Sequence, residues 1–210
     1  MRKIGIGLAI ALGIGVLVIS LQPAEQRVER EAKIDAPLDF VMAQLQDFRR
    51  WPAWSPWENL DPNLDREYAG APAGVGATYH WTGNEDVGEG RMRIVRIEPL
   101  RELAIELNFI KPSAARHEMT FTLEPAGAAT VVRWAMSGRR DLAGRFAALF
   151  VDGDAALGTD FEAGLAALAK VCEAEAADWR RDLLVGAETA AEKEAAAAEA
   201  AVLRIGPEKP

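Results

Sequence analysis

The chain has 210 residues, of which 50 % are hydrophobic, and it carries a formal net charge of −8 at pH 7. This length and apolar content are sufficient for one domain with a buried core and exclude a disordered chain. The acidic excess argues against binding to nucleic acid phosphates. One cysteine, Cys172, and two histidines exclude an internal disulfide and leave too few ligands for a Cys/His metal cluster. No metal and no organic cofactor is predicted.

Residues 1–24 predict a membrane anchor. Arg2 and Lys3 precede an uncharged stretch from Ile4 to Leu21, which at about 1.5 Å per residue can cross a hydrocarbon core of about 30 Å. Because the end of this stretch lacks small residues at a cleavage site, an uncleaved single-pass helix is favoured over a cleaved signal peptide. The basic N-terminus favours a soluble domain outside the cytoplasm. Small residues at every fourth position of 7–15 leave open a homodimer or ordinary glycine use in a membrane helix.

Residues 25–180 are predicted to form one α+β domain that opens with a strand and a helix. Val28 to Ile34 has the composition of a strand. Asp35-Ala36-Pro37 then forms a turn that places proline at the start of a helix running to about Asp47.

The middle of the chain, from Asn63 to Ser137, alternates apolar and polar residues. The alternation is clearest over 103–109, 117–123 and 131–136, and shorter strands are predicted at 77–81 and 90–97. Turn residues such as glycine, proline and asparagine separate these segments. Consecutive strands joined by short turns predict an antiparallel sheet.

The last third of the chain changes to helical spacing. One long helix is predicted to cover a face of the sheet with the apolar stripe Leu157, Phe161, Leu165, Leu168 and Cys172. Gly153 and Gly158 interrupt its beginning, so 142–150 is predicted to be a separate turn or short helix. The Ala/Glu-rich residues 181–210 are either a solvated extension of the helix or a frayed tail.

Three segments resemble one known family. They are the Trp- and Pro-rich run Asp47–Glu58, the glycine-rich run Gly74–Asn84 and the late run Phe150–Leu165. In these segments the chain resembles polyketide cyclase/dehydrase-like members of the START-like (SRPBCC) superfamily, over about Glu29 to Glu173. The resemblance implies a helix-grip fold, in which a curved antiparallel β-sheet is wrapped around a long C-terminal helix. It also implies a cavity that accepts apolar molecules in many relatives.

The residues expected to line such a cavity are aromatic, methionine and leucine side chains and one histidine on one face of the sheet. Aromatic residues of the Trp-rich run and of the long helix are expected to complete the lining. The predicted ligand-binding residues are Trp54, Trp57, Tyr79, Trp81, Met92, Leu107, Phe109, His117, Met119, Phe121, Trp134 and Phe161. The same residues would also suit a solid core, and the pattern leaves both alternatives open.

Trp51, Trp54 and Trp57 are spaced by three residues, and Pro52 and Pro56 limit the length of any helical turn that holds them. A rigid aromatic corner is predicted. Its three tryptophans either pack in the core, or one of them contacts the ligand at the mouth of the cavity. Any indole buried there is expected to find an acceptor for its N–H group.

The two histidines are predicted to face opposite ways. His80 lies between two aromatic residues and should point away from the core, whereas His117 shares its face with Met119 and Phe121 and would supply a polar group at the cavity end. No catalytic residue is assigned, because a general acid or base needs a tuned pKa and a substrate within reach. No nucleotide-binding, hydrolase or zinc-protease motif is present.

The leading functional hypothesis is a membrane-anchored protein that binds a small hydrophobic ligand, lipid or polyketide-like, in a cavity between sheet and helix. A cyclase/dehydrase-type enzyme acting on an apolar substrate is a second hypothesis, which rests on the resemblance alone. The third is an interaction module with a filled core, which dimerises through its membrane helix or docks its Ala/Glu tail on a partner.

Overall fold

Seven strands form a single antiparallel sheet in the computed structural model, which describes residues 21, 23–140, 142–147 and 153–204. The strands are β1 (Glu25–Ile34), β2 (Asp65–Gly70), β3 (Ala77–Thr82), β4 (Glu89–Glu98), β5 (Glu102–Lys111), β6 (Ala115–Ala126) and β7 (Ala129–Arg139). The helices are α2 (Leu38–Leu45), the 3₁₀ helix η1 (Phe48–Ala53), α3 (Leu142–Ala147) and α4 (Gly153–Arg204).

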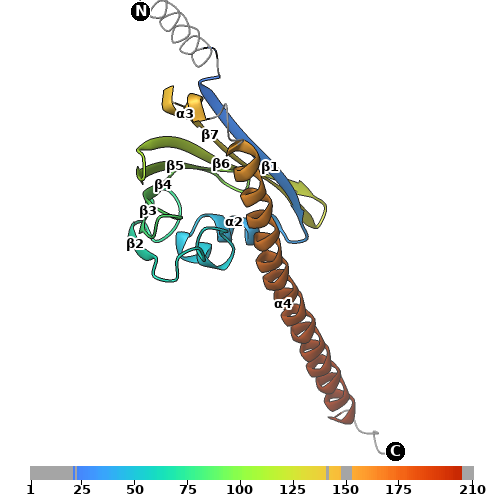
Figure 1. Ribbon diagram of the computed structural model, residues 1–210. Coiled ribbons are helices and arrows are strands. Elements are labelled where there is room, and N and C mark those ends of the chain that lie inside the picture. The colour runs from blue at the N-terminus through green and yellow to red at the C-terminus, as the bar shows by residue number, and fades with distance from the viewer. Residues whose placement is uncertain (1–20, 22, 141, 148–152, 205–210) are drawn as a thin grey trace, which may run out of the picture.

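The order of strands across the sheet is β1-β7-β6-β5-β4-β3-β2, so each strand from β2 to β7 pairs with its neighbour in sequence. The exception is β1, which pairs with β7 and forms one edge of the sheet. The hairpin between β6 and β7 turns through two residues, 127 and 128, and Gly127 adopts a φ of 72° there. Two-residue hairpin turns require such positive φ values, which glycine adopts without strain. The curved sheet is visible in Figure 1.

The strand register places apolar side chains in rows across one face of the sheet. The first row joins Tyr79, Met92, Leu107 and His117; the second joins Ile94, Ile105, Met119 and Met136; the third joins Leu103, Phe121 and Trp134. Directly opposed residues in an antiparallel pair point to the same face. The predicted alternation is therefore confirmed, and it identifies the face that is buried.

Helices α2 and α4 and the η1 segment cover this face. Pro37 stands at the N-cap of α2, which buries Val41, Met42 and Leu45. The predicted stripe of α4 is confirmed: Phe161, Leu165, Leu168 and Cys172 are all nearly inaccessible to solvent, and Leu157 is partly buried against the core. Burial raises the pKa of the Cys172 thiol to about 12, in agreement with a space-filling role.

Helix α4 continues beyond the domain, as Figure 1 shows. It runs without a break through the described part of the Ala/Glu-rich tail, so the alternative of a helical extension is confirmed up to Arg204. The predicted short helix before it is α3, described over Leu142–Ala147, and positions 148–150 of the predicted segment lie outside the described residues. The edge strand β2 is the one strand that the sequence pattern does not single out.

Among the described residues, no helix is both long and apolar enough to cross a bilayer. The predicted anchor lies outside the described residues up to position 20, as does the small-residue stripe of 7–15. The anchor and a homodimer formed through it therefore stay predictions from sequence.

Candidate ligand-binding cavity

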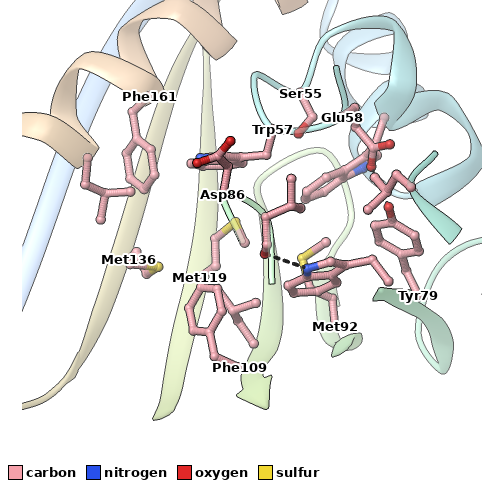
Figure 2. Close-up of a pocket in the computed structure, with 16 residues that line it drawn as sticks. Ser55, Trp57, Glu58, Tyr79, Asp86, Met92, Phe109, Met119, Met136 and Phe161 are labelled. Atoms are coloured by element: carbon pink, nitrogen blue, oxygen red, sulfur yellow. Dashed lines mark hydrogen bonds between the residues drawn. The ribbon is translucent and has the colours of Figure 1, made fainter. Parts of the chain in front are cut away.

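A cavity of about 200 Å³ lies between the sheet, the segment that follows α2 and the beginning of α4 (Figure 2). Strands β3 to β7 supply its floor, η1 and the loop after it supply one side, and α4 supplies another. Its lining consists of Trp51, Ser55, Trp57, Glu58, Leu64, Tyr79, Trp81, Asp86, Val87, Met92, Leu107, Phe109, Met119, Met136, Leu157 and Phe161.

Most of the predicted ligand-binding residues lie on this wall. The structure brings together Trp57, Tyr79, Trp81, Met92, Leu107, Phe109, Met119 and Phe161. Gly90 helps to position one of them, because a Cβ atom there would come within 2.3 Å of the Trp81 ring. The Trp81 indole therefore lies close to the Gly90 backbone of β4, and it donates its N–H to the Val87 carbonyl at 3.3 Å.

Three other predicted residues, Trp54, Phe121 and Trp134, do not line the cavity, because aromatic rings cover the third row of the sheet. The centroids of Trp54 and Phe121 are 6.2 Å apart, and those of Trp54 and Trp134 are 5.8 Å apart, both in edge-to-face contact. Phe161 stacks on Trp134 with centroids 4.2 Å apart. One end of the sheet face is thus solid core, and the other end lines the cavity. The two alternatives left open by the sequence, a filled core and a cavity, therefore each apply to a different part of this face.

The Trp-rich corner has the predicted local structure. Asp47 caps η1 by accepting a hydrogen bond from the Arg49 backbone N–H at 2.9 Å. The buried Trp51 indole donates to the Leu45 carbonyl at 3.2 Å, as expected. The expectation fails for Trp54, whose Nε1 atom has no acceptor among the described residues. Packing against other rings holds this indole in place instead.

The histidines face opposite ways, as predicted. His80 points outward, where its nitrogens lie 3.6 Å from Glu67 and 3.5 Å from Glu89. His117 points to the core face and contacts Phe109 edge-to-face, at 5.7 Å between centroids, but it does not line the cavity. Burial lowers the pKa of His117, so its ring is neutral at pH 7.

A buried carboxylate is the main feature of the cavity that the sequence pattern did not identify. Glu58 is only 5 % exposed. Its Oε1 atom accepts a hydrogen bond from the Tyr79 hydroxyl at 2.7 Å, and its Oε2 atom accepts one from Arg66 Nε at 2.7 Å. Arg66 also donates to the Glu58 carbonyl at 2.8 Å and to the Leu64 carbonyl at 3.0 Å.

These hydrogen bonds determine the protonation of the two partners of Glu58. The bond to Glu58 raises the pKa of Arg66, which keeps the guanidinium charged. Burial, followed by the hydrogen bond to Glu58, raises the pKa of Tyr79, so the phenol keeps its proton and donates it to the carboxylate. The cavity therefore has a polar end, at which Ser55, Glu58 and Tyr79 lie together in Figure 2, and an apolar remainder that includes Met136 and Phe161.

Comparison with known proteins agrees with this architecture. The family model described as "Polyketide cyclase / dehydrase and lipid transport" matches residues 25–173. No curated protein matches the chain.

Three solved structures show the same fold at low sequence identity. The Aha1 dimer from Colwellia psychrerythraea is 19 % identical with a TM-score of 0.52, and the match covers 70 % of this chain and 96 % of that one. Protein MLL2253 from Mesorhizobium loti is 18 % identical with a TM-score of 0.52 and the same coverage. Protein CV1439 from Chromobacterium violaceum is 17 % identical with a TM-score of 0.50, over 72 % of this chain and 98 % of that one.

The family match covers the whole sheet and most of the part of α4 that packs on the domain. It includes the Trp-rich corner and every residue of the cavity wall described above. The chain belongs to the polyketide cyclase/dehydrase and lipid transport family of the START-like (SRPBCC) superfamily, as its resemblance predicts.

Proposed function

We propose that this protein binds a small hydrophobic ligand in the cavity between the sheet and α4. The observation that carries the proposal is the cavity itself, because a protein whose sole role was to present its surface would have no need of an unfilled core. The lining is mainly aromatic rings, leucines and methionines, with a few polar groups at one end, which is typical of small-molecule sites. With the N-terminal anchor predicted from sequence, this site would be held beside a membrane.

The volume of the cavity limits the size of the ligand. Small-molecule pockets commonly measure about 300–1,000 Å³, whereas an apolar cavity of about 150 Å³ is sufficient for benzene. A cavity of about 200 Å³ therefore suits a compound of one or two rings or a short branched chain. A longer lipid requires the wall to move, and Met92, Met119 and Met136 are the flexible side chains that permit this.

An enzyme of the cyclase or dehydrase type is a second candidate, with one observation in its favour. Tyr79 and Glu58 are titratable groups that meet on the cavity wall, as an acid–base pair would. The hydrogen bonds of Tyr79 and Glu58, however, suit the positioning of a ligand better than acid–base catalysis. The Tyr79 proton is directed at Glu58, and the Glu58 charge is compensated by Arg66.

Native mass spectrometry of the full chain, purified gently from its own host, tests the proposal. Bound compounds are extracted with solvent and identified. Phe109→Glu places a charge on the half-buried edge of the cavity wall and is expected to abolish the adduct. The matched control is Ile110→Glu, at the next position of β5, where the side chain is 44 % exposed and points to the other face.

A reproducible apolar adduct that is lost in Phe109→Glu but kept in Ile110→Glu supports ligand binding. Circular dichroism of both variants checks that the sheet is intact. A chain that carries no adduct and takes up nothing from a panel of lipids and small aromatic compounds would contradict the proposal. A compound that is released chemically changed would favour the enzyme.

A further inference from the structure

The polar end of the cavity consists mainly of hydrogen-bond acceptors. A carboxylate has about four acceptor positions on its two oxygens. The described residues use one on each oxygen of Glu58, for Tyr79 and for Arg66. About two acceptor positions are therefore unused by the described residues, on a side chain that lines the cavity. The Tyr79 oxygen can also accept, but its proton is already donated to Glu58.

In the part of the chain that the structure describes, no cation balances this end from inside the cavity. Among the described lining residues there is no lysine, arginine or histidine. Arg66 lies outside the lining and directs its guanidinium to Glu58 and to two backbone carbonyls. Asp86 is exposed and adds a second carboxylate to the lining, beside Trp57 rather than at the end held by Glu58 and Tyr79 (Figure 2).

The donors that remain on the wall are neutral ones, including the Ser55 hydroxyl and the Trp57 indole N–H. A ligand carboxylate that entered this end would have to lose its water beside the buried Glu58 without gaining a positive partner. A ligand hydroxyl, by contrast, brings the donor that Glu58 can accept. The polar end therefore distinguishes ligands by the charge and hydrogen-bonding character of their head group.

We propose that the cavity selects an uncharged apolar molecule that ends in a hydrogen-bond donor, an alcohol or a phenol, which donates to Glu58, and that it rejects the corresponding carboxylate. This inference rests on the proposed ligand binding and specifies its chemical class. The proposed selectivity excludes fatty acids and aromatic acids, because their carboxylate is charged, although their hydrocarbon part would suit the apolar lining.

Two matched sets of compounds test the selectivity. Each set has one skeleton and three end groups: benzyl alcohol, toluene and benzoate, and the same three groups on a naphthalene ring. Binding to the full chain in lipid nanodiscs is measured by equilibrium dialysis, with empty nanodiscs as the blank for partition into lipid. In the better-fitting set, the alcohol should bind about tenfold more tightly than the hydrocarbon and at least about tenfold more tightly than the carboxylate.

Glu58→Gln removes the charge with little change of shape. In this variant the preference for the alcohol should fall to about twofold or less, while hydrocarbon binding is retained. The matched control is Glu67→Gln on β2, because the Glu67 side chain is 75 % exposed and pairs with His80 on the outer face. This control should keep the full preference of the unmodified chain.

The outcomes separate the two proposals. If no compound of either set binds, ligand binding itself is overturned. If the hydrocarbon binds as tightly as the alcohol, or the carboxylate binds more tightly, the selectivity is overturned and ligand binding stands. Should Glu58→Gln fail to fold, the ranking of the three end groups on the unmodified chain still decides between these results.

Discussion

His117 lies on the core face of β6, where its Nδ1 atom has no hydrogen-bond partner among the described residues. Its neighbours are Leu107 in the first row of the sheet, Gly138 at the paired position of β7, and the Phe109 ring. A Cβ atom at Gly138 would come within 2.2 Å of the His117 ring, so glycine makes room for the imidazole there. Burial is the cause that lowers the pKa of this imidazole.

This lowered pKa predicts how the stability of the fold depends on pH. Above the usual imidazole pKa of about 6.5 the ring is neutral in both the folded and the unfolded chain, and it causes no pH dependence. As the pH falls below that value, the unfolded chain takes up the proton first, so the free energy of unfolding decreases. The decrease ends once the folded protein is protonated as well.

Replacing His117 with leucine should remove this contribution. Urea unfolding midpoints, measured from pH 8 to pH 5, should fall less steeply for His117→Leu than for the unmodified chain, and the two curves should run parallel above pH 7. Parallel curves over the whole pH range would show that burial does not lower the pKa of His117.

The individual residues of the cavity were predictable to different degrees. Alternation places Leu107, Phe109 and Met119 on one face because that face is apolar along each strand. The same alternation cannot tell an open row from a covered one, and Phe121 is covered by Trp51 and Trp54 from a distant segment. Whether a side chain lines a cavity thus depends on tertiary contacts that have no local pattern.

Glu58 shows the same limit for polar groups. Its partners stand eight residues away, at Arg66, and twenty-one residues away, at Tyr79. No periodicity connects these positions, since the irregular loop between η1 and β2 brings them together. From sequence alone, a glutamate after a Trp- and Pro-rich run is expected to be a solvent-exposed loop residue.

At the level of elements, α4 comes close to the sheet at Gly164. A Cβ atom there would lie 2.7 Å from the Trp134 ring and 3.1 Å from Pro56. The Trp134 ring is fully buried and is stacked on Phe161 of the same helix. A rigid, enclosed ring cannot move aside at small cost, so glycine determines how near the helix can lie.

Gly164→Ala is expected to destabilise the fold by about 1–3 kcal/mol through overpacking, partly offset by the better helix propensity of alanine, about 1 kcal/mol. Gly186→Ala is the matched control on the same helix, because a Cβ atom at Gly186 would meet nothing within 4 Å. Chemical unfolding followed by circular dichroism should show a loss of stability for the first variant and none for the second. Equal stability of the two variants would mean that α4 can shift without cost.

Elements were predicted best where one face is buried. The alternating strands β3 to β7 and the apolar stripe of α4 are signals of this kind. Strand β2 was not singled out because it lies at the edge of the sheet and Asp65–Gly70 has no fully buried side chain to mark an inner face. Its pairing with β3 comes from backbone hydrogen bonds, which are independent of side-chain type.

On the scale of the whole molecule, α4 divides into a part that packs on the sheet and a part that does not (Figure 1). Its last contacts with the domain include Trp179, whose ring meets Phe40 at 5.8 Å, and Arg180, which donates to the Asp35 carbonyl at 3.4 Å. Beyond them, large apolar side chains such as Leu183 and Leu184 are more than half exposed. In the Ala/Glu-rich part, each residue whose exposure the structure describes is also exposed.

Removal of residues 187–210 should therefore leave the unfolding midpoint of the domain unchanged while the helical signal in circular dichroism decreases. The physical reason is that the residues of this part whose exposure the structure describes bury no apolar surface against the sheet, and helix propensity adds only locally to stability. A shorter chain that also lacks 176–186 is the informative comparison, since it loses the buried Ala176 and the Trp179–Phe40 contact and should unfold at a lower urea concentration. If removal of 187–210 alone lowers the midpoint, this segment stabilises the fold through contacts that the isolated chain does not show, such as those with a partner.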